Sequence, residues 1–170
     1  MNNDRIVYMK ILFIQTGGTI DKDYPRTTLG YAFEITEPAV NRILPDINPT
    51  FEYEIVSACK KDSTELTDED RQKIYQICAE NSADKIIITH GTDTMIQTAE
   101  KLSDIKNKII VITGSMRPEK FSNTDADFNI GLAVGAVQTL PAGVYITMHG
   151  TLLPWDKITR NLETGQFIQK

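Results

Sequence analysis

Cysteine is scarce in this chain, and neither copy has the spacing of a functional pair. Cys59 and Cys78 are the only cysteines, and no histidine stands beside either of them. Isolated thiols of this kind are typical of reduced core residues rather than of a disulfide or a catalytic pair. His90 and His149, the only histidines, form no metal-ligand spacing with the scattered carboxylates. We therefore expect no metal and no other cofactor.

Clusters of positive charge and long hydrophobic runs are missing as well. The formal net charge is −5, and the longest basic run is the pair Lys60–Lys61, which argues against a nucleic-acid partner. No stretch reaches the roughly eighteen apolar residues of a membrane helix. The first residues, Met1 to Arg5, lead into no apolar signal core. A cytoplasmic protein that binds neither nucleic acid nor membrane is expected.

The length and composition indicate one globular domain. The chain has 170 residues, of which 41% are hydrophobic and 24% charged, as in soluble globular proteins. A chain of this size can bury a core without disulfides or metals. It contains no low-complexity tract and no repeat of the length that marks a solenoid. We expect a single domain over residues 1–170.

Three apolar runs each stop at a turn rich in hydroxyl groups and glycine. The runs with their turns are Ile11–Ile14 with Thr16–Ile20, Ile86–Ile88 with Thr89–Thr94, and Ile109–Ile112 with Thr113–Pro118. A continuous apolar run of strand length is typical of a parallel strand that is covered on both faces. The carboxyl ends of parallel strands share one edge of the sheet, where open α/β folds bind ligands. The three turns are thus expected in one crevice.

The segment after the first strand lacks periodicity. Residues Asp21 to Tyr31 are polar and interrupted by proline and glycine, which predicts a loop long enough to be mobile. Thr36 is expected to cap a short helix that begins near Pro38 and is bounded by Pro45 and Pro49.

Strand and helix then alternate to the end of the chain. The expected strands are 51–56, which is less buried, and 144–146; the expected helices follow Thr67, begin near 92–94, and run from about 124 to before 141. Thr67 is followed by acidic residues, as is common in the first turn of a helix. This alternation predicts the α/β class: a three-layer sandwich with a mostly parallel, flavodoxin- or Rossmann-like sheet.

The turns supply the groups that acyl transfer requires. A threonine hydroxyl is a poor nucleophile at neutral pH and needs a neighbouring base, and a reacting carbonyl needs donors for its oxyanion. Thr16–Thr19 offers hydroxyls and two glycine N–H groups, and Thr92–Asp93 offers a hydroxyl beside a carboxylate. No Walker motif or serine elbow is present. Acyl transfer by a threonine is therefore favoured over phosphate or nucleotide binding.

Each turn taken alone has a simpler explanation. Gly17 and Gly18 suit any tight turn, and Thr92 with Asp93 suits an ordinary helix N-terminus. Three strand ends with the same chemistry in one crevice are harder to obtain from turn preferences, so the combination favours a site.

The three turns together resemble the N-terminal domain of the bacterial-type L-asparaginases. Their order, spacing and placement at strand ends agree, and the likeness covers nearly the whole chain. The resemblance implies hydrolysis of L-asparagine to L-aspartate and ammonia. It places the nucleophile on Thr19 and the second catalytic threonine, which handles protons or the attacking water, on Thr92. A tyrosine that encloses the nucleophile falls on Tyr31, with Tyr24 as a less well placed competitor.

The resemblance also implies how the substrate is held. Asp93 matches the aspartate that grips the α-ammonium group, and Ser63 matches the serine that holds the α-carboxylate. Ser115 matches the turn whose backbone carbonyl meets the leaving nitrogen. Without the family, Ser63 would be assigned to an exposed turn before a helix. The implied substrate-binding residues are Gly18, Asp62, Ser63, Thr64, Gly91 and Ser115.

One catalytic position departs from the family pattern. The family has an essential lysine near the second threonine and the aspartate, and its position falls on Arg160. Arginine keeps the positive charge but cannot release a proton at working pH, so turnover is expected to be slow if the lysine accepts one. Lys157 is an alternative. The implied catalytic residues are Thr19, Tyr31, Thr92, Asp93 and Arg160.

A second departure concerns length. Family members continue into a smaller C-terminal domain that contributes to a neighbouring subunit's site, and this chain stops at Lys170. We expect the single N-terminal-type domain without its C-terminal companion, and hence a more open crevice that excludes water less well.

Three functions follow as hypotheses. An asparaginase-type hydrolase comes first, and a module that binds aspartate, asparagine or a related amino acid without turnover comes second. An amidotransferase subunit that deamidates for a partner protein ranks well behind. The expected ligand is a small amide or amino acid, and the expected assembly is a homo-oligomer, most simply an isologous dimer.

Overall fold

The computed structural model describes residues 9–170 and contains a six-stranded central sheet in the order β10-β9-β8-β7-β1-β6. Its strands are β1 (Lys10–Gly17), β6 (Glu52–Lys61), β7 (Lys85–Thr89), β8 (Ile109–Thr113), β9 (Gly143–Met148) and β10 (Thr151–Pro154). β10 alone runs antiparallel within this sheet. The order of the five parallel strands is the flavodoxin-like one, so the expected fold class is confirmed.

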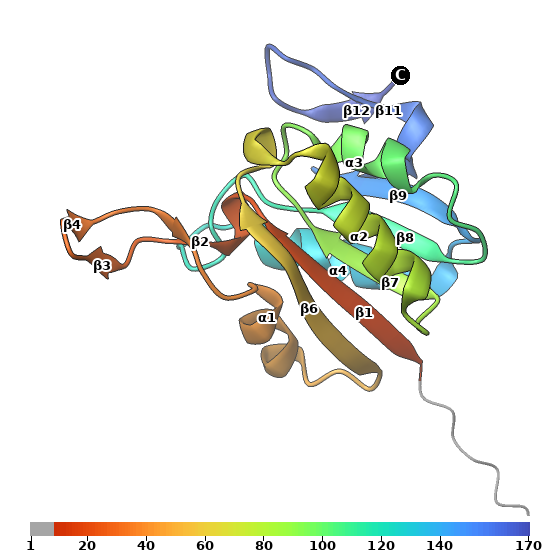
Figure 1. Cartoon of the computed structure of the whole chain (residues 1–170), viewed down its shortest axis with the longest axis horizontal. Helices are drawn as coiled ribbons and strands as arrows, with labels where there is room; N and C mark the ends of the chain where they lie inside the picture. The colour runs from red at the N-terminus through yellow and green to blue at the C-terminus, as the bar shows by residue number, and fades with distance from the viewer. Residues whose placement is uncertain (1–8) are drawn as a thin grey trace, which may run out of the picture.

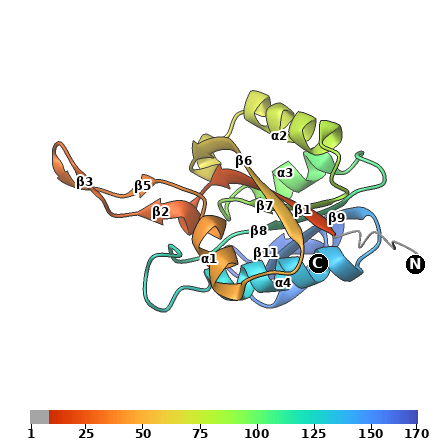
Figure 2. The same ribbon diagram turned by 90° about the horizontal axis from the view of Figure 1, so that it is seen from below.

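Helices cover both faces of the sheet, as the alternation predicts. α1 (Val40–Ile47) and α4 (Ala126–Thr139) lie on one face, and α2 (Asp68–Glu80) and α3 (Met95–Leu102) lie on the other (Figures 1 and 2). The hydrophobic core is accordingly split by the sheet into two clusters. The layers form the expected three-layer sandwich.

The continuous apolar runs are explained by this double coverage. Along β1, Leu12 and Ile14 pack under α2 and α3, whereas Ile11 and Phe13 pack under α1 and α4, and all four are fully buried. Side chains alternate between the faces of a strand, so a central strand needs apolar residues at every position. Edge strand β6 is mostly half-buried or exposed, in keeping with its more alternating sequence.

Helix α2 begins where the sequence predicts. The Thr67 hydroxyl accepts a hydrogen bond from the Asp70 amide, and the Asp70 carboxylate accepts one from the Thr67 amide, which forms a capping box. α3 and α4 also lie within two residues of their expected starts.

The prediction for α1 was wrong in its details. The helix begins at Val40, and Thr36 does not cap it; instead the Thr36 amide donates to the carbonyl oxygen of Asp21 at 2.9 Å. Pro45 lies inside the helix, in its last turn, rather than beyond its end. A proline near the end of a short helix forfeits one hydrogen bond but leaves the preceding turns intact, so tertiary contacts outweighed the sequence signal.

The segment expected to be a plain loop forms two short antiparallel ribbons. These are β2 (Lys22–Asp23) with β5 (Glu34–Ile35), and β3 (Arg26–Thr27) with β4 (Gly30–Tyr31). Together they project from the body of the molecule as an arm (Figure 1), called the 22–35 arm below. Most of its residues are exposed.

The chain ends in a hairpin that the sequence analysis did not foresee. After η3 (Trp155–Lys157), β11 (Ile158–Arg160) pairs with β12 (Phe167–Gln169), beside β9 and α3 (Figure 1). Ile158 and Phe167 are buried in the same core cluster as α2 and α3, and this packing fixes the hairpin against the domain. No helix within residues 9–170 has the length and apolarity needed to cross a membrane.

Candidate active site

The turns predicted to form the site lie at the carboxyl edge of the sheet, where the order of successive strands reverses between β1 and β7. From β1 the chain passes to β6 on one side, and from β6 it returns to β7 on the other. The turns after these strands contain η1 (Thr19–Asp21) and η2 (Ser63–Glu65). Ligands bind at such switch points because the adjacent connections diverge to opposite faces.

Glycines allow the turns to touch backbone to backbone. A Cβ on Gly18 would lie 2.4 Å from both the Cα and the nitrogen of Gly91, and a Cβ on Gly91 would lie 2.7 Å from Cβ and Oγ of Ser63. A Cβ on Gly114 would lie 2.3 Å from the His90 carbonyl oxygen. No real side chain tolerates such approaches, so these glycines bring the turns after β1, β6, β7 and β8 into contact.

The threonines of the turns divide into two groups. Thr16 donates its hydroxyl to the Thr89 carbonyl at 2.9 Å, and Thr113 donates to the Thr147 carbonyl at 2.9 Å, so both hydroxyls are buried between strands. Thr19 and Thr92 lie farther along their turns and are half-buried. Thr19 and Thr92 are therefore more accessible than Thr16 and Thr113.

His90 stabilises the turn after β7. Its Nδ1 lies 2.7 Å from the Gly91 carbonyl oxygen and must donate to it, which leaves Nε2 to accept from the Thr98 hydroxyl at 2.8 Å. Burial lowers the pKa of His90 to about 4, although the hydrogen bond to Gly91 opposes the shift. A neutral His90 thus ties the turn to α3.

Ser63 is joined to the Thr92–Thr94 turn. Its hydroxyl accepts a hydrogen bond from the Asp93 amide at 3.3 Å, and its carbonyl oxygen accepts one from the Thr94 hydroxyl at 2.7 Å. A hydroxyl that accepts from an amide still has its own proton to donate. Ser63 is therefore able to donate to a ligand carboxylate while the Asp93 amide holds it in place, although its side chain is almost fully buried.

Arg160 reaches the Asp93 carboxylate. Its Nη1 forms an ion pair and hydrogen bond with Asp93 Oδ1. Nε donates to the Gly165 carbonyl at 3.2 Å, and the guanidinium lies 5.9 Å from the centre of the Phe167 ring. The terminal hairpin thereby supplies and orients this arginine.

Lys157 takes no part in this contact. It is exposed in η3 and pairs with Asp156 at 3.2 Å. The positive charge beside Asp93 therefore comes from Arg160, at the position that the family resemblance indicates.

Two carboxylates lie near the first turn. Asp62 caps η2 and accepts a hydrogen bond from Lys22 at 2.8 Å, which lowers the pKa of Asp62. Asp21 is fully buried and accepts the Ala39 amide on Oδ1 at 2.7 Å, while Oδ2 has no partner within residues 9–170. Burial raises the pKa of Asp21 to about 6. The sequence analysis missed Asp21, because nothing in its neighbours marks it as buried.

The turn after β8 is held by residues that the sequence analysis also missed. Asp125 accepts the backbone N–H groups of Met116 and Arg117 at 3.0 and 3.1 Å. Asn129 donates to the Gly114 carbonyl at 2.9 Å, and the Ser115 hydroxyl donates to the Arg117 carbonyl. Ser115 is buried within its own turn, and its hydroxyl is already hydrogen-bonded there. An aspartate just before a helix was the one available signal.

The structure does not bring Tyr31 to the other site residues. It belongs to β4, at the far end of the 22–35 arm, and 64% of its surface is exposed (Figure 1). Its ring stacks on Tyr24 at 5.8 Å, and Tyr24 contacts Phe33 at 4.9 Å. Tyr31 therefore lies apart from the rest of the expected site.

Thr64, another expected site residue, is exposed on η2.

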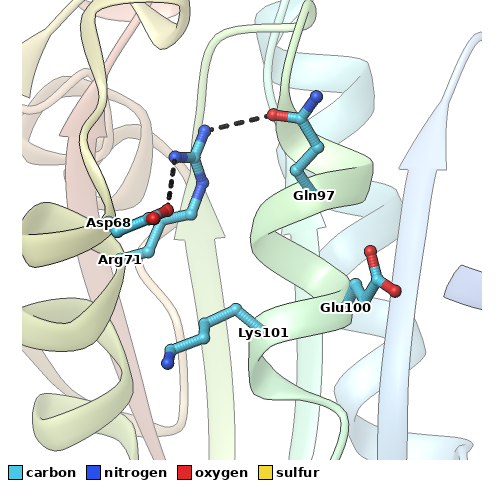
Figure 3. A pocket seen from close by; sticks show the side chains of 5 residues that line it. All are labelled: Asp68, Arg71, Gln97, Glu100 and Lys101. Atoms are coloured by element: carbon cyan, nitrogen blue, oxygen red, sulfur yellow. Dashed lines mark hydrogen bonds and ion pairs between the residues drawn. The ribbon is translucent and has the colours of Figure 1, made fainter.

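A polar pocket lies between the helices α2 and α3, which follow two of the site turns. Arg71 on α2 donates to the Gln97 side chain on α3 at 3.3 Å (Figure 3). Arg71 also donates to the Leu66 carbonyl at 3.0 Å. Because α2 follows Ser63 and α3 follows Asp93, this link helps to fix the two residues relative to each other. Residues 9–170 contain no group of three or more His, Cys, Asp or Glu side chains arranged to hold a metal.

Comparison with known proteins identifies the family. Residues 10–165 match the family model described as "Asparaginase, N-terminal". The chain belongs to the asparaginase family. The resemblance carried by the three turns is thus confirmed, and it extends over nearly all of the described residues.

Relatives of known name include both a hydrolase and a component of an amidotransferase. A glutaminase-asparaginase of Acinetobacter glutaminasificans is 26% identical over 174 aligned residues, covering 94% of this chain and 53% of that protein. A component of the Glutamyl-tRNA(Gln) amidotransferase of Methanococcus vannielii is 40% identical over 93 residues, covering 54% of this chain and 21% of that protein.

Solved asparaginase structures share the fold. The thermostable L-asparaginase from Thermococcus kodakarensis superposes with a TM-score of 0.78 at 28% identity, covering 95% of this chain and 51% of that one. L-asparaginase I from Vibrio cholerae gives a TM-score of 0.82 at 23% identity, covering 96% and 52%. This asparaginase-family chain spans about half the length of these structures.

Proposed function

We propose that this asparaginase-family domain is an amidohydrolase that converts L-asparagine to L-aspartate and ammonia. The observation that carries the proposal is the contact between the Thr19 and Thr92 turns through Gly18 and Gly91. This contact gathers two half-buried threonines and the Asp93 carboxylate at one sheet edge. These are the groups that attack on an amide and recognition of an α-amino acid require.

Substrate recognition is assigned to the Ser63–Asp93 pair. The Asp93 carboxylate binds the α-ammonium group, and the Ser63 hydroxyl donates to the α-carboxylate. The Asp93 backbone amide donates to the Ser63 hydroxyl at 3.3 Å, which joins the two residues at this point of the site. Arg160 orients Asp93 through one carboxylate oxygen, which leaves the other oxygen for the substrate.

The reaction proceeds through an ester on Thr19. The Thr19 oxygen attacks the side-chain amide carbon, and backbone N–H groups of the turns stabilise the oxyanion. The Thr19 proton passes through Thr92 or water to the amide nitrogen, the C–N bond breaks, and ammonia leaves past the backbone carbonyl of Ser115. Water beside Thr92 then attacks the ester: its hydroxyl joins the acyl carbon to give aspartate, and its remaining proton restores the Thr19 hydroxyl.

Proton transfer is the slow part of this scheme. Arg160 stays charged and cannot accept a proton, and His90 is buried with both ring nitrogens occupied. Thr92 and water are therefore left to carry the protons. We therefore expect slow turnover.

Ammonia release from asparagine tests the proposal directly. We expect Thr19→Ala to lower kcat by roughly a thousandfold or more, because the covalent route is lost. Thr92→Val, which keeps the shape of the side chain, should cause a comparable loss. Unchanged activity in both variants would remove the mechanism. Glutamine should be assayed in parallel, since one relative is a glutaminase-asparaginase.

A binding module without turnover is the second candidate. The Arg160–Asp93 ion pair motivates it, because a fixed cation in place of a titratable lysine preserves recognition and weakens proton transfer. Calorimetry with aspartate and asparagine separates the two candidates. Micromolar binding with no ammonia release would favour the module.

An amidotransferase role is the third candidate, and the similarity to the Methanococcus vannielii protein motivates it. In this role the chain would pass its ammonia to a partner protein, whereas the proposed hydrolase releases free ammonia alone. If the purified chain releases ammonia at the same rate with and without a partner protein, this role is contradicted.

We place the protein in the cytoplasm, the location that the name of a Campylobacter jejuni neighbour gives for that asparaginase.

A further inference from the structure

A second cavity lies away from the crevice, between α1 and α4. Its volume is about 360 Å³, within the range of small-molecule sites. Ile43 on α1 and Ile130 and Val134 on α4 line it with side chains that are almost fully buried, and the half-exposed Ile47 flanks it. The two helices lie on the same face of the sheet (Figure 2), and the interior of the cavity is aliphatic.

Gly131 keeps this cavity open. It lies in the middle of α4, and a Cβ built there would meet no atom within 4 Å. Packing within residues 9–170 therefore does not require a glycine, although glycine in a helix costs about 1 kcal/mol relative to alanine. Gly131 is exposed and lines the cavity, so a larger side chain at this position would obstruct its mouth.

The rim of the cavity is negatively charged. Asp46 on α1 and Asp127 on α4 both line it, and neither forms an ion pair within the described part of the chain. A third carboxylate, Glu119, is bound by Arg42 through two contacts of 2.5 Å. Two unneutralised carboxylates thus border an aliphatic interior.

We propose that this cavity binds a small aliphatic amine. The hydrocarbon chain would lie against the Ile43, Ile130 and Val134 side chains, where it is removed from water. The ammonium group would remain at the rim between the carboxylates of Asp46 and Asp127. Charge complementarity selects a cation over an alcohol or a carboxylic acid of the same length. This site is independent of the proposed hydrolase activity.

Binding of hexylamine, followed by methyl NMR, tests the proposal. At pH 7 we expect saturable shifts of the methyl signals of Ile43, Ile47 and Ile130. The Kd of hexylamine should be roughly threefold or more below that of 1-hexanol, since each exposed ion pair adds a modest gain. Hexanoate should bind most weakly. Equal affinity for hexylamine and hexanol, or no saturable shift, would overturn the proposal.

Two glycines provide a matched pair of variants. Gly131→Leu should abolish the hexylamine shifts, because the new side chain obstructs the cavity, whereas Gly135→Leu should leave them unchanged. Gly135 lies one turn farther along α4, is equally free of neighbours, and does not line the cavity. Asp127→Asn should weaken hexylamine binding and spare hexanol. Equal binding by the Gly131→Leu variant and the unaltered chain would place the ligand elsewhere and overturn the proposal.

Discussion

At the scale of single residues, Arg160 is the most informative position, because the family resemblance implies a lysine there. The family's lysine can lose a proton, and an arginine at the same place cannot. The structure nevertheless places the guanidinium on Asp93 and supports it from Gly165 and Phe167. Its contribution is therefore electrostatic: it orients the carboxylate that we assign to the substrate ammonium.

Replacement of Arg160 tests that contribution. Arg160→Ala should raise KM for asparagine about tenfold or more, because Asp93 loses its orientation and binding energy is lost in both ground and transition states. Arg160→Lys restores the charge and should recover most of the affinity. The urea midpoint should change little, since ion pairs that are partly exposed contribute at most about 1 kcal/mol. Identical KM values for all three proteins would contradict the assignment.

Asp21 predicts a pH-dependent stability. Its folded-state pKa of about 6 lies above the ordinary value of 3.8, so the carboxyl binds its proton more tightly when folded. This contribution to stability is fully present below the unfolded pKa and is lost as the pH rises through about 6. Asp21→Asn lacks the ionisation and should be more stable than the unaltered chain at pH 8 by about 2 to 3 kcal/mol.

Urea unfolding of both proteins at pH 8 and pH 3.5 measures this effect. The advantage of Asp21→Asn should shrink toward zero at the lower pH, where both side chains are neutral. Asp46→Asn is the matched control, because Asp46 is exposed on α1. An advantage that is independent of pH would mean that ionisation of Asp21 is not its cause.

At the scale of elements, the sequence was reliable where a signal is local. The capping box at Thr67 fixes the start of α2, and the apolar runs fix the strands. It was unreliable where distant contacts decide. Thr36 looks like a helix cap in sequence, but its amide pairs with the Asp21 carbonyl, and Pro45 is tolerated inside α1.

The contact between turns predicts that replacing Gly18 lowers the stability of the protein. Gly18→Ala should destabilise the protein by roughly 2 kcal/mol or more, because its Cβ would lie 2.4 Å from the Gly91 backbone and φ is +81°. Gly30→Ala is the matched control, since φ is +116° there and nothing lies within 4 Å of the added atom. Urea unfolding should show the smaller loss in the control. Equal losses would indicate that φ strain, and not the contact between turns, determines the cost.

At the scale of the whole molecule, we expect self-association through an aromatic cluster on and beside the 22–35 arm. Tyr24, Tyr31, Phe33 and Phe121 are 49%, 64%, 58% and 39% exposed, and neighbouring rings lie 4.9 to 5.9 Å apart. Contiguous exposed apolar surface of this kind commonly marks an interface. An isologous dimer is the simplest assembly.

Light scattering tests the assembly. We expect a mass of twice the single chain, and a shift toward the single-chain mass in Phe33→Ser. Phe128→Ser is the control, because Phe128 is similarly exposed, at 63%, but lies on α4 outside the cluster. A single-chain mass at every concentration would contradict the dimer.

The sequence by itself determined the fold and the edge of the sheet at which the site lies. Continuous apolar runs and their alternation with helices are local patterns, and in a parallel sheet they leave one arrangement of the turns. The tertiary structure decided which side chains meet. Only the tertiary structure shows that the Thr16 hydroxyl is hydrogen-bonded to the neighbouring strand, whereas Thr19 lies beyond the strand and is half-buried. Likewise, only packing of the terminal hairpin carries Arg160 to Asp93, 67 residues away. Such contacts depend on distances between remote segments, and no local pattern of residues encodes them.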